Sequence, residues 1–118
     1  MDASFYELTG KTLNDIDIND SKDVIKFICS DGTVYILYHE QDCCEIVNIE
    51  DITGDLEDLL YSEIIISEES TEECKECSDH GTWTFYKLAT SKGYVTIRWL
   101  GESNGSYSES VTFKRQLI

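Results

Sequence analysis

Residues 38–45, YHEQDCCE, bring a histidine, three acids and two adjacent cysteines into one short stretch. His39 and Asp42 could act as a base and its orienting carboxylate, with Cys43 or Cys44 as the activated nucleophile. The acids of the stretch oppose this chemistry, because negative neighbours raise the pKa of a thiol. The sequence therefore favours a structural turn in which one of the two cysteines is buried and the acids cap backbone amides. A small-ligand pocket and a cysteine enzyme stay as the alternatives.

A second cysteine pair, Cys74 and Cys77, has the C-x-x-C spacing of a zinc knuckle, and His80 follows three residues later. A structural zinc ion needs four protein ligands, usually from two such pairs. The other candidate ligands lie in YHEQDCCE, where adjacent cysteines rarely bind the same ion. Cys74, Cys77 and His80 are therefore weak candidates for a metal site, and a redox pair is a further alternative. An incidental loop without a cofactor is favoured.

Arg98 is well suited to bind an anion, since its guanidinium group matches carboxylate and phosphate groups. It precedes Trp99 in an alternating segment, so the two side chains are expected on opposite faces of a strand. A pocket that used Arg98 and Trp99, with His39 and Asp42, would suit a nucleotide. No glycine-rich phosphate loop accompanies these residues, and a core face backed by a solvated face is favoured.

These residues are positioned by segments in which apolar and polar side chains alternate. Asp31 and Gly32 predict a tight hairpin, and Asn104 and Gly105 predict another turn. We expect strands at 12–18, 23–30, 33–40, 63–67, 82–90, 94–102 and 106–118. Apolar spacings of three and four predict a short helix at 49–60, and the polar segment 68–81 predicts a loop. The predicted fold is α+β but mainly β, an antiparallel curved sheet or small open barrel of about seven strands with one short helix.

The composition is that of a globular protein, and residues 1–118 are expected to form a single domain. Apolar residues make up 41% of the chain, which is too many for a disordered protein. No apolar run approaches the about 20 residues that cross a bilayer, and the first residues do not resemble a signal peptide. An odd number of cysteines, five, favours reduced thiols over a disulfide framework. A cytoplasmic location is therefore expected.

Negative charge is concentrated in one part of the chain. The 24 acids and nine bases give a net charge of −15, and residues 40–79 hold fifteen of the acids with a single base, Lys75. Like charges at this density repel one another and destabilise the folded chain, so they invite a functional explanation beside the simpler one of a solvated surface. Such a field disfavours binding to nucleic acid or an anionic membrane and favours binding to a basic protein surface.

Two blocks of the sequence are distinctive: YHEQDCCE with the following IEDITGDLEDLL, and WTFYKLATSKGYVTIRWLGESNGSYSES. On these blocks the chain resembles a family of small, functionally uncharacterised proteins found in bacteriophages and bacterial genomes, over residues 10–111. The resemblance implies a phage or mobile-element origin and a setting in the cytoplasm of the host cell. It implies no activity and no catalytic residues.

The function we expect from the charge is that of a non-enzymatic inhibitor. An acidic, DNA-mimicking segment would bind the basic, nucleic-acid-binding surface of a host or defence protein, such as a CRISPR effector, nuclease or polymerase. The predicted partner-binding residues are nine acids of the segment: Glu50, Asp51, Asp55, Glu57, Asp58, Glu68, Glu69, Glu72 and Glu73. The alternatives are a protein that sequesters a nucleotide signal and a zinc-binding interaction module.

Overall fold

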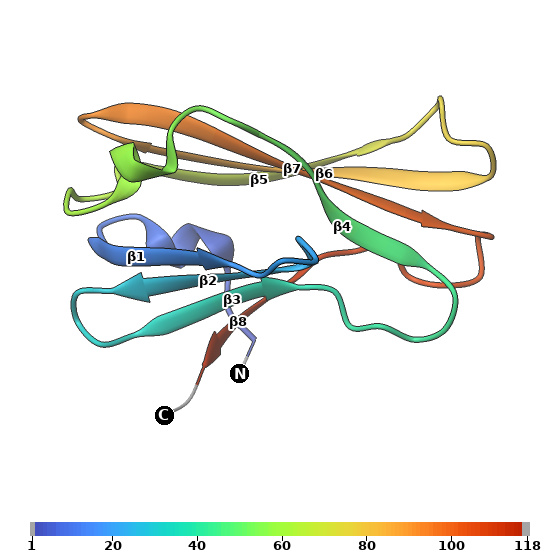
Figure 1. The fold of residues 1–118 in the computed structure, drawn as a ribbon, viewed down its shortest axis with the longest axis horizontal. Helices are drawn as coiled ribbons and strands as arrows, with labels where there is room; N and C mark the ends of the chain where they lie inside the picture. The colour runs from blue at the N-terminus through green and yellow to red at the C-terminus, as the bar shows by residue number, and fades with distance from the viewer. Residues whose placement is uncertain (1, 117–118) are drawn as a thin grey trace.

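The computed structural model describes residues 2–116, and over these residues the chain forms two antiparallel sheets of four strands (Figure 1). The first sheet has the order β1-β2-β3-β8, with bounds Leu13–Ile18 (β1), Val24–Cys29 (β2), Val34–Tyr38 (β3) and Thr112–Gln116 (β8). The second sheet has the order β4-β7-β6-β5, with bounds Ile46–Thr53 (β4), Gly93–Ser103 (β7), His80–Thr90 (β6) and Ile66–Glu73 (β5). The two sheets lie face to face as two layers (Figure 1).

The chain changes sheets twice, and both crossings lie at the same end of the molecule (Figure 1). Strands β1 to β3 form a meander in the first sheet, and residues 39–45 then lead to β4 in the second. Strands β5, β6 and β7 form a second meander, after which residues 104–111 return the chain to β8 beside β3. The stretch YHEQDCCE is therefore mostly the first crossing between the layers.

The core lies between the two sheets, where the inward residues of both alternate with outward polar ones. On β7, Val95, Ile97 and Trp99 are fully buried, as the alternation of this strand predicts. Phe5 fills the side of the core, with its ring centroid 4.6 Å from that of Tyr86 in the second sheet and 5.2 Å from that of a β8 phenylalanine in the first. Aromatic contacts thus join the two layers directly.

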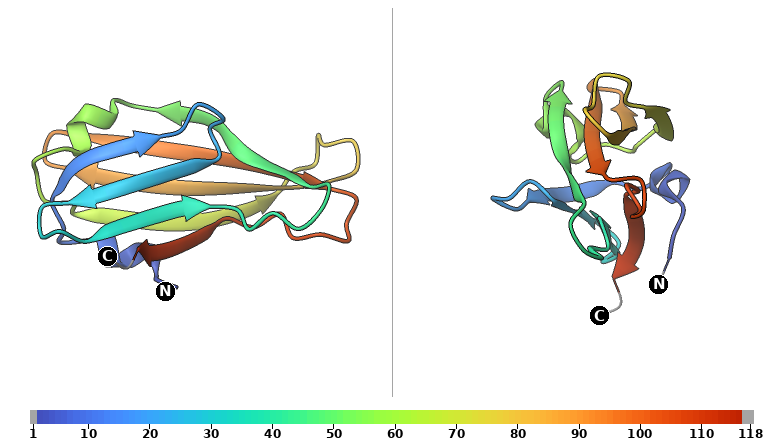
Figure 2. Two further views of the ribbon diagram at one scale, coloured as in Figure 1. Left: turned by 60° about the horizontal axis from the view of Figure 1, so that its bottom comes forward. Right: turned by 90° about the vertical axis from the view of Figure 1, so that its right-hand side faces the viewer.

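The described residues also form two short 3-10 helices, one before β1 and one between β4 and β5. Helix η1 (Phe5–Leu8) begins with a capping box, in which Ser4 and Glu7 exchange side-chain and backbone hydrogen bonds. It lies on the side of the sandwich next to β5 and beside the N-terminal end of the described chain (Figure 2). Helix η2 (Leu56–Leu59) follows β4 and is capped by Asp55. No helix of the described residues is long and apolar enough to cross a membrane.

The mainly β, antiparallel prediction is confirmed, and so are the hairpins β2–β3 and β6–β7. The strands form two packed sheets and no closed barrel over residues 2–116. Eight strands are present in this part of the chain, one more than expected, and the helical content is confined to 3-10 turns. A split into two layers buries the apolar faces of both meanders, which one open sheet would leave exposed.

The helix predicted at 49–60 is wrong over its first half, which forms strand β4. Val47 and Ile49 point into the core at the spacing of two that a strand requires. A bulge between Ile49 and Asp51 then inserts one extra residue, so Ile52 is the next to pack against the core. The bulge therefore produces an apolar spacing of three, which imitates one face of a helix in the sequence.

Gly54 ends strand β4 rather than interrupting a helix. Its φ of +100° lies in the left-handed region, and an added Cβ would come within 2.3 Å of the backbone oxygen of Tyr94. A side chain at this position is therefore excluded both by backbone strain and by contact with β7. The turn that glycine permits directs the chain into η2.

The loop predicted at 68–81 is also wrong over its first half, because residues 68–73 belong to β5. Every residue from Ile66 to Glu73 pairs with a partner on β6. The strand expected at 63–67 covers only the first two residues of β5, because both faces are polar after Ser67 and no apolar alternation marks the rest. The strongly acidic part of the chain is consequently held in regular structure.

Candidate functional site

Strand β5, here called the acidic strand, carries four glutamates and forms one edge of the second sheet. Within the described residues its only strand neighbour is β6. Glu68 and Glu72 lie on the outer face of the sheet, while Glu69 and Glu73 lie on the face that carries the core. All four side chains are exposed. The edge therefore presents carboxylates on both of its sides.

The number of charges per length of the acidic strand is close to that of a nucleic-acid backbone. From Glu68 to Glu73 the strand extends over about 17 Å, at about 3.3 Å per residue. One strand of DNA carries about five charges over the same distance, and the acidic strand carries four. The hydrogen-bonded ladder with β6 fixes this arrangement. A basic surface built for phosphates would meet a similar density of negative charge here.

The other five predicted partner-binding acids lie elsewhere on the molecule. They are on β4 or in and around η2: Glu50, Asp51, Asp55, Glu57 and Asp58. Glu50 is paired with Arg98 at 2.9 Å, and the carboxylate of Asp55 accepts a hydrogen bond from the backbone of η2. Because β4 and β5 are opposite edges of the sheet, the structure does not bring the nine acids together on one edge.

The alternative ligand pocket is not assembled. Arg98 lies on the outer face of the second sheet, paired with Glu50 and 4.8 Å from the ring centroid of Trp83. Trp99 is fully buried on the opposite face, and its indole N–H has no hydrogen-bond partner in the described residues. His39 and Asp42 lie in the first crossing between the sheets. The four residues therefore share no common cavity.

His39 is a structural residue of that crossing. Its Nε2 lies 2.7 Å from the carboxylate of Glu45, and its Nδ1 lies 2.7 Å from the backbone oxygen of Ser110. Both partners are acceptors, so a ring that donates from both nitrogens satisfies the two contacts. The side chains of His39 and Glu45 are 4% and 0% exposed, respectively. The pair ties together the two segments that cross between the sheets.

Glu45, rather than Asp42, is the carboxylate partner of His39. Its two oxygens also accept hydrogen bonds from the backbone amides of Asp42 and Cys43, at 2.9 and 2.8 Å. The favoured interpretation of YHEQDCCE, a turn in which an acid caps backbone amides, describes this arrangement, but the buried cysteine expected there is wrong, because Cys43 and Cys44 are both exposed. The hydrogen bond from His39, together with those of the amides, lowers the pKa of Glu45 from its ordinary 4.5 to about 2.

We expect the substitution Glu45→Gln to lower the melting temperature by several degrees at neutral pH. A carboxyl whose pKa is lowered by folding stabilises the protein above its unfolded-state pKa, near 4.5, and this contribution is lost as the pH falls towards 2. The difference between the two proteins should therefore shrink over that interval. Thermal unfolding followed by circular dichroism measures it. Asp42→Asn, an exposed change in the same turn, is the control, and a pH-independent difference would contradict this account.

The Cys74–Cys77 pair lies just after the acidic strand, at the turn that leads to β6. The structure joins the two by a disulfide, so the expectation of reduced thiols is wrong for this pair. The side chain of His80 is 61% exposed and lies 3.7 Å from Asp79. Among residues 2–116, no group of three or more histidine, cysteine or acidic side chains is arranged to hold a metal ion.

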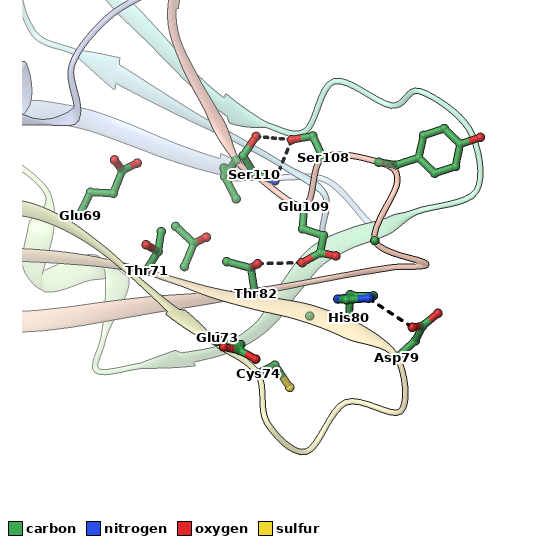
Figure 3. Close-up of a pocket in the computed structure, with 15 residues that line it drawn as sticks. Glu69, Thr71, Glu73, Cys74, Asp79, His80, Thr82, Ser108, Glu109 and Ser110 are labelled. Atoms are coloured by element: carbon green, nitrogen blue, oxygen red, sulfur yellow. Dashed lines mark hydrogen bonds and ion pairs between the residues drawn. The ribbon is translucent and has the colours of Figure 1, made fainter.

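A cleft of about 560 Å³ adjoins the inner face of the acidic strand (Figure 3). Here called the β5 cleft, it lies between β5 and β6 on one side and the second crossing on the other. Its lining is acidic or hydroxyl-bearing for the most part and includes Glu69, Thr71, Glu73, Thr82, Thr84, Ser108 and Glu109. Sequence analysis missed this cleft. The available signal was the threonines at 82 and 84, which occupy inward positions that are apolar further along β6.

Fold and site together define a small two-layer β protein with an acidic sheet edge and an adjoining polar cleft. The chain belongs to the family described as a domain of unknown function, DUF7448, whose family model matches residues 6–113. Comparisons with curated proteins and with solved structures find no match to the chain.

Proposed function

We propose that this protein is a non-enzymatic inhibitor that binds a basic, nucleic-acid-binding surface of another protein. The acidic strand takes the place of nucleic-acid phosphates in that surface. The targets that fit this chemistry are host or defence proteins such as CRISPR effectors, nucleases and polymerases, met in the cytoplasm of a phage-infected cell. The observation that carries the proposal is the set of four exposed glutamates fixed along one sheet edge.

The position of the charges supports this function. A protein that imitates a phosphate backbone binds a groove more tightly when its carboxylates are held on a rigid element. A mobile segment that carried the same carboxylates would lose conformational entropy on binding. The acidic strand satisfies this need through its pairing with β6. Charged residues on an edge strand also discourage pairing with another sheet edge, and this protective role is the simpler explanation of the same glutamates. The net charge of −15 adds long-range attraction to a basic partner.

Salt tests the proposal. Between about 0.1 M and about 1 M salt the Debye length falls from about 10 Å to about 3 Å, so we expect the dissociation constant for the partner to rise about tenfold or more. Most of the change should be a slower association rate, because screening removes the long-range attraction. The measurement is surface plasmon resonance against the partner, captured from host lysate and identified by mass spectrometry.

Competition with nucleic acid completes the test. If the acidic strand occupies the nucleic-acid site, DNA or RNA that the partner binds should displace the protein. A stable ternary complex with nucleic acid would show that the two occupy different surfaces. Binding that is insensitive to salt would likewise leave the acidic strand as solvated surface.

A further inference from the structure

The β5 cleft continues the opening between the two sheets. Further along this side, η1 closes the opening, because Phe5 packs against both Tyr86 and the first sheet. Beyond η1 the inner face of the acidic strand faces the second crossing across the cleft (Figure 3). The volume of about 560 Å³ lies in the range of sites that bind small molecules or short peptide segments.

The residues that line the cleft suit a positively charged group that donates hydrogen bonds. Glu69 and Glu73 face the cleft without a cation opposite them, since their cross-strand partners are Tyr86 and Thr82. Neither lysine nor arginine is among the described residues that line it. On the outer face, by contrast, Glu68 lies directly opposite Lys87. The two sides of the acidic strand thus differ in how far their charge is compensated.

The carboxylate of Glu109 faces into the same cleft from the second crossing, where it accepts a hydrogen bond from the Thr82 hydroxyl at 2.7 Å (Figure 3). It also accepts one from the hydroxyl of Ser103. These contacts fix Glu109 in place and leave its negative charge uncompensated by any cation among its recorded contacts. The cleft therefore has carboxylates on both of its walls.

A second observation is a buried polar group without a partner, which does not itself line the cleft but lies directly beside Glu69, whose side chain does. Tyr86 is fully buried next to Thr84 on the inner face of β6, and its hydroxyl has no hydrogen-bond partner in the described residues. The hydroxyl lies beside the Glu69 carboxylate, and burial followed by this neighbour raises the pKa of the phenol. Buried hydroxyls normally have a partner. A donor placed between Tyr86 and Glu69 would satisfy both groups.

We propose that the β5 cleft binds an arginine or lysine side chain on a short basic segment of the partner. The charged group pairs with Glu69 at the inner end of the cleft and donates to the Tyr86 hydroxyl, while Glu73 attracts the charge near the mouth. This inference rests on the proposed function and extends it. The inner side of the acidic strand is then a specific binding site for a cation, in addition to its contribution to the long-range electrostatic attraction of a basic partner.

The test uses the full chain and the peptide acetyl-Gly-Arg-Gly-amide as the probe, titrated into the millimolar range. Amide chemical shifts measured by NMR should move at cleft residues such as Thr71 and Thr84. The peptide in which citrulline replaces arginine has the same shape without the charge, and it should cause no saturable change. In the variant Glu69→Gln/Glu73→Gln, binding of the arginine peptide should weaken by about tenfold or more, because charged hydrogen bonds are lost.

The matched control is Glu68→Gln/Glu72→Gln, which removes the same charge from the outer side of the same strand and should weaken binding less than about twofold. Equal losses in the two variants, binding of the citrulline peptide, or no saturable shifts in the cleft would each overturn the inference. The proposed function fails separately. If both variants weaken partner binding equally, the inference about the cleft is contradicted and the proposed function is supported. If neither variant weakens partner binding, both proposals are contradicted.

Discussion

Replacement of Trp99 by alanine is expected to lower the free energy of unfolding by about 3–5 kcal/mol. The indole is fully buried on the inner face of β7, the central strand next to β4 and β6, and no smaller side chain fills the space that it leaves. Its N–H has no partner in the described residues, so the loss comes from packing and burial rather than from a broken hydrogen bond. Urea unfolding followed by circular dichroism measures the change.

Trp83 provides a matched control. It lies on the neighbouring strand β6 but on the outer face, where it is only partly buried beneath Arg98. Trp83→Ala should cost about 1 kcal/mol or less, because it opens no internal cavity. Similar losses for the two tryptophans, or a larger loss for Trp83, would contradict the assignment of inner and outer faces.

Reversal of the four charges of the acidic strand should weaken partner binding by at least about a hundredfold, because each new lysine faces a basic surface with a like charge. The variant replaces every glutamate of β5 by lysine: Glu68, Glu69, Glu72 and Glu73. These side chains are exposed, so the fold should be retained. The association and dissociation rates for the partner provide the measurement, with circular dichroism to verify folding.

The control must change the net charge equally at a different place. Four exposed aspartates on or beside the first sheet serve this purpose when replaced by lysine: Asp2, Asp15, Asp17 and Asp20. Both variants carry the same net charge, so an effect of total charge alone would weaken binding to the same extent in each. Only a much larger loss in the β5 variant supports a specific surface. Unchanged affinity in that variant would exclude the acidic strand as the binding edge.

The hairpins of the fold could be predicted from the sequence because each combines alternation with a turn signal. The β2–β3 pair has one buried face and Gly32 at a positive φ in its turn, which is the pattern that defines a hairpin. Strand β5 offered neither signal. Its inner face is polar where it lines the cleft, and only the pairing with β6 makes it a strand. The secondary structure of the segment that carries the candidate site is therefore determined by tertiary pairing rather than by its local sequence.

The interactions of YHEQDCCE could be predicted in kind but not in detail. A turn with a capping acid was favoured, but Asp42 rather than Glu45 was considered as the partner of His39. The correct partner depends on Ser110, which lies far away in the sequence and fixes the second nitrogen of the ring. The β5 cleft was hidden for the same reason, because its two walls come from segments that only the crossings bring together.

The meeting of the first and last parts of the described chain bears on the order in which the protein folds. The backbone of Ala3 donates to the oxygen of Phe113, and Asp2 forms a bridge with Lys114. Closing a loop of this length lowers the conformational entropy of the chain before any stabilising contact forms. Folds rich in contacts between residues far apart in the sequence therefore fold slowly. On a ribosome, both meanders can form as soon as their strands emerge. The complete first sheet and the contact of Phe5 with Phe113 must wait for β8, and the β5 cleft acquires its second wall only after residues 104–111 have emerged.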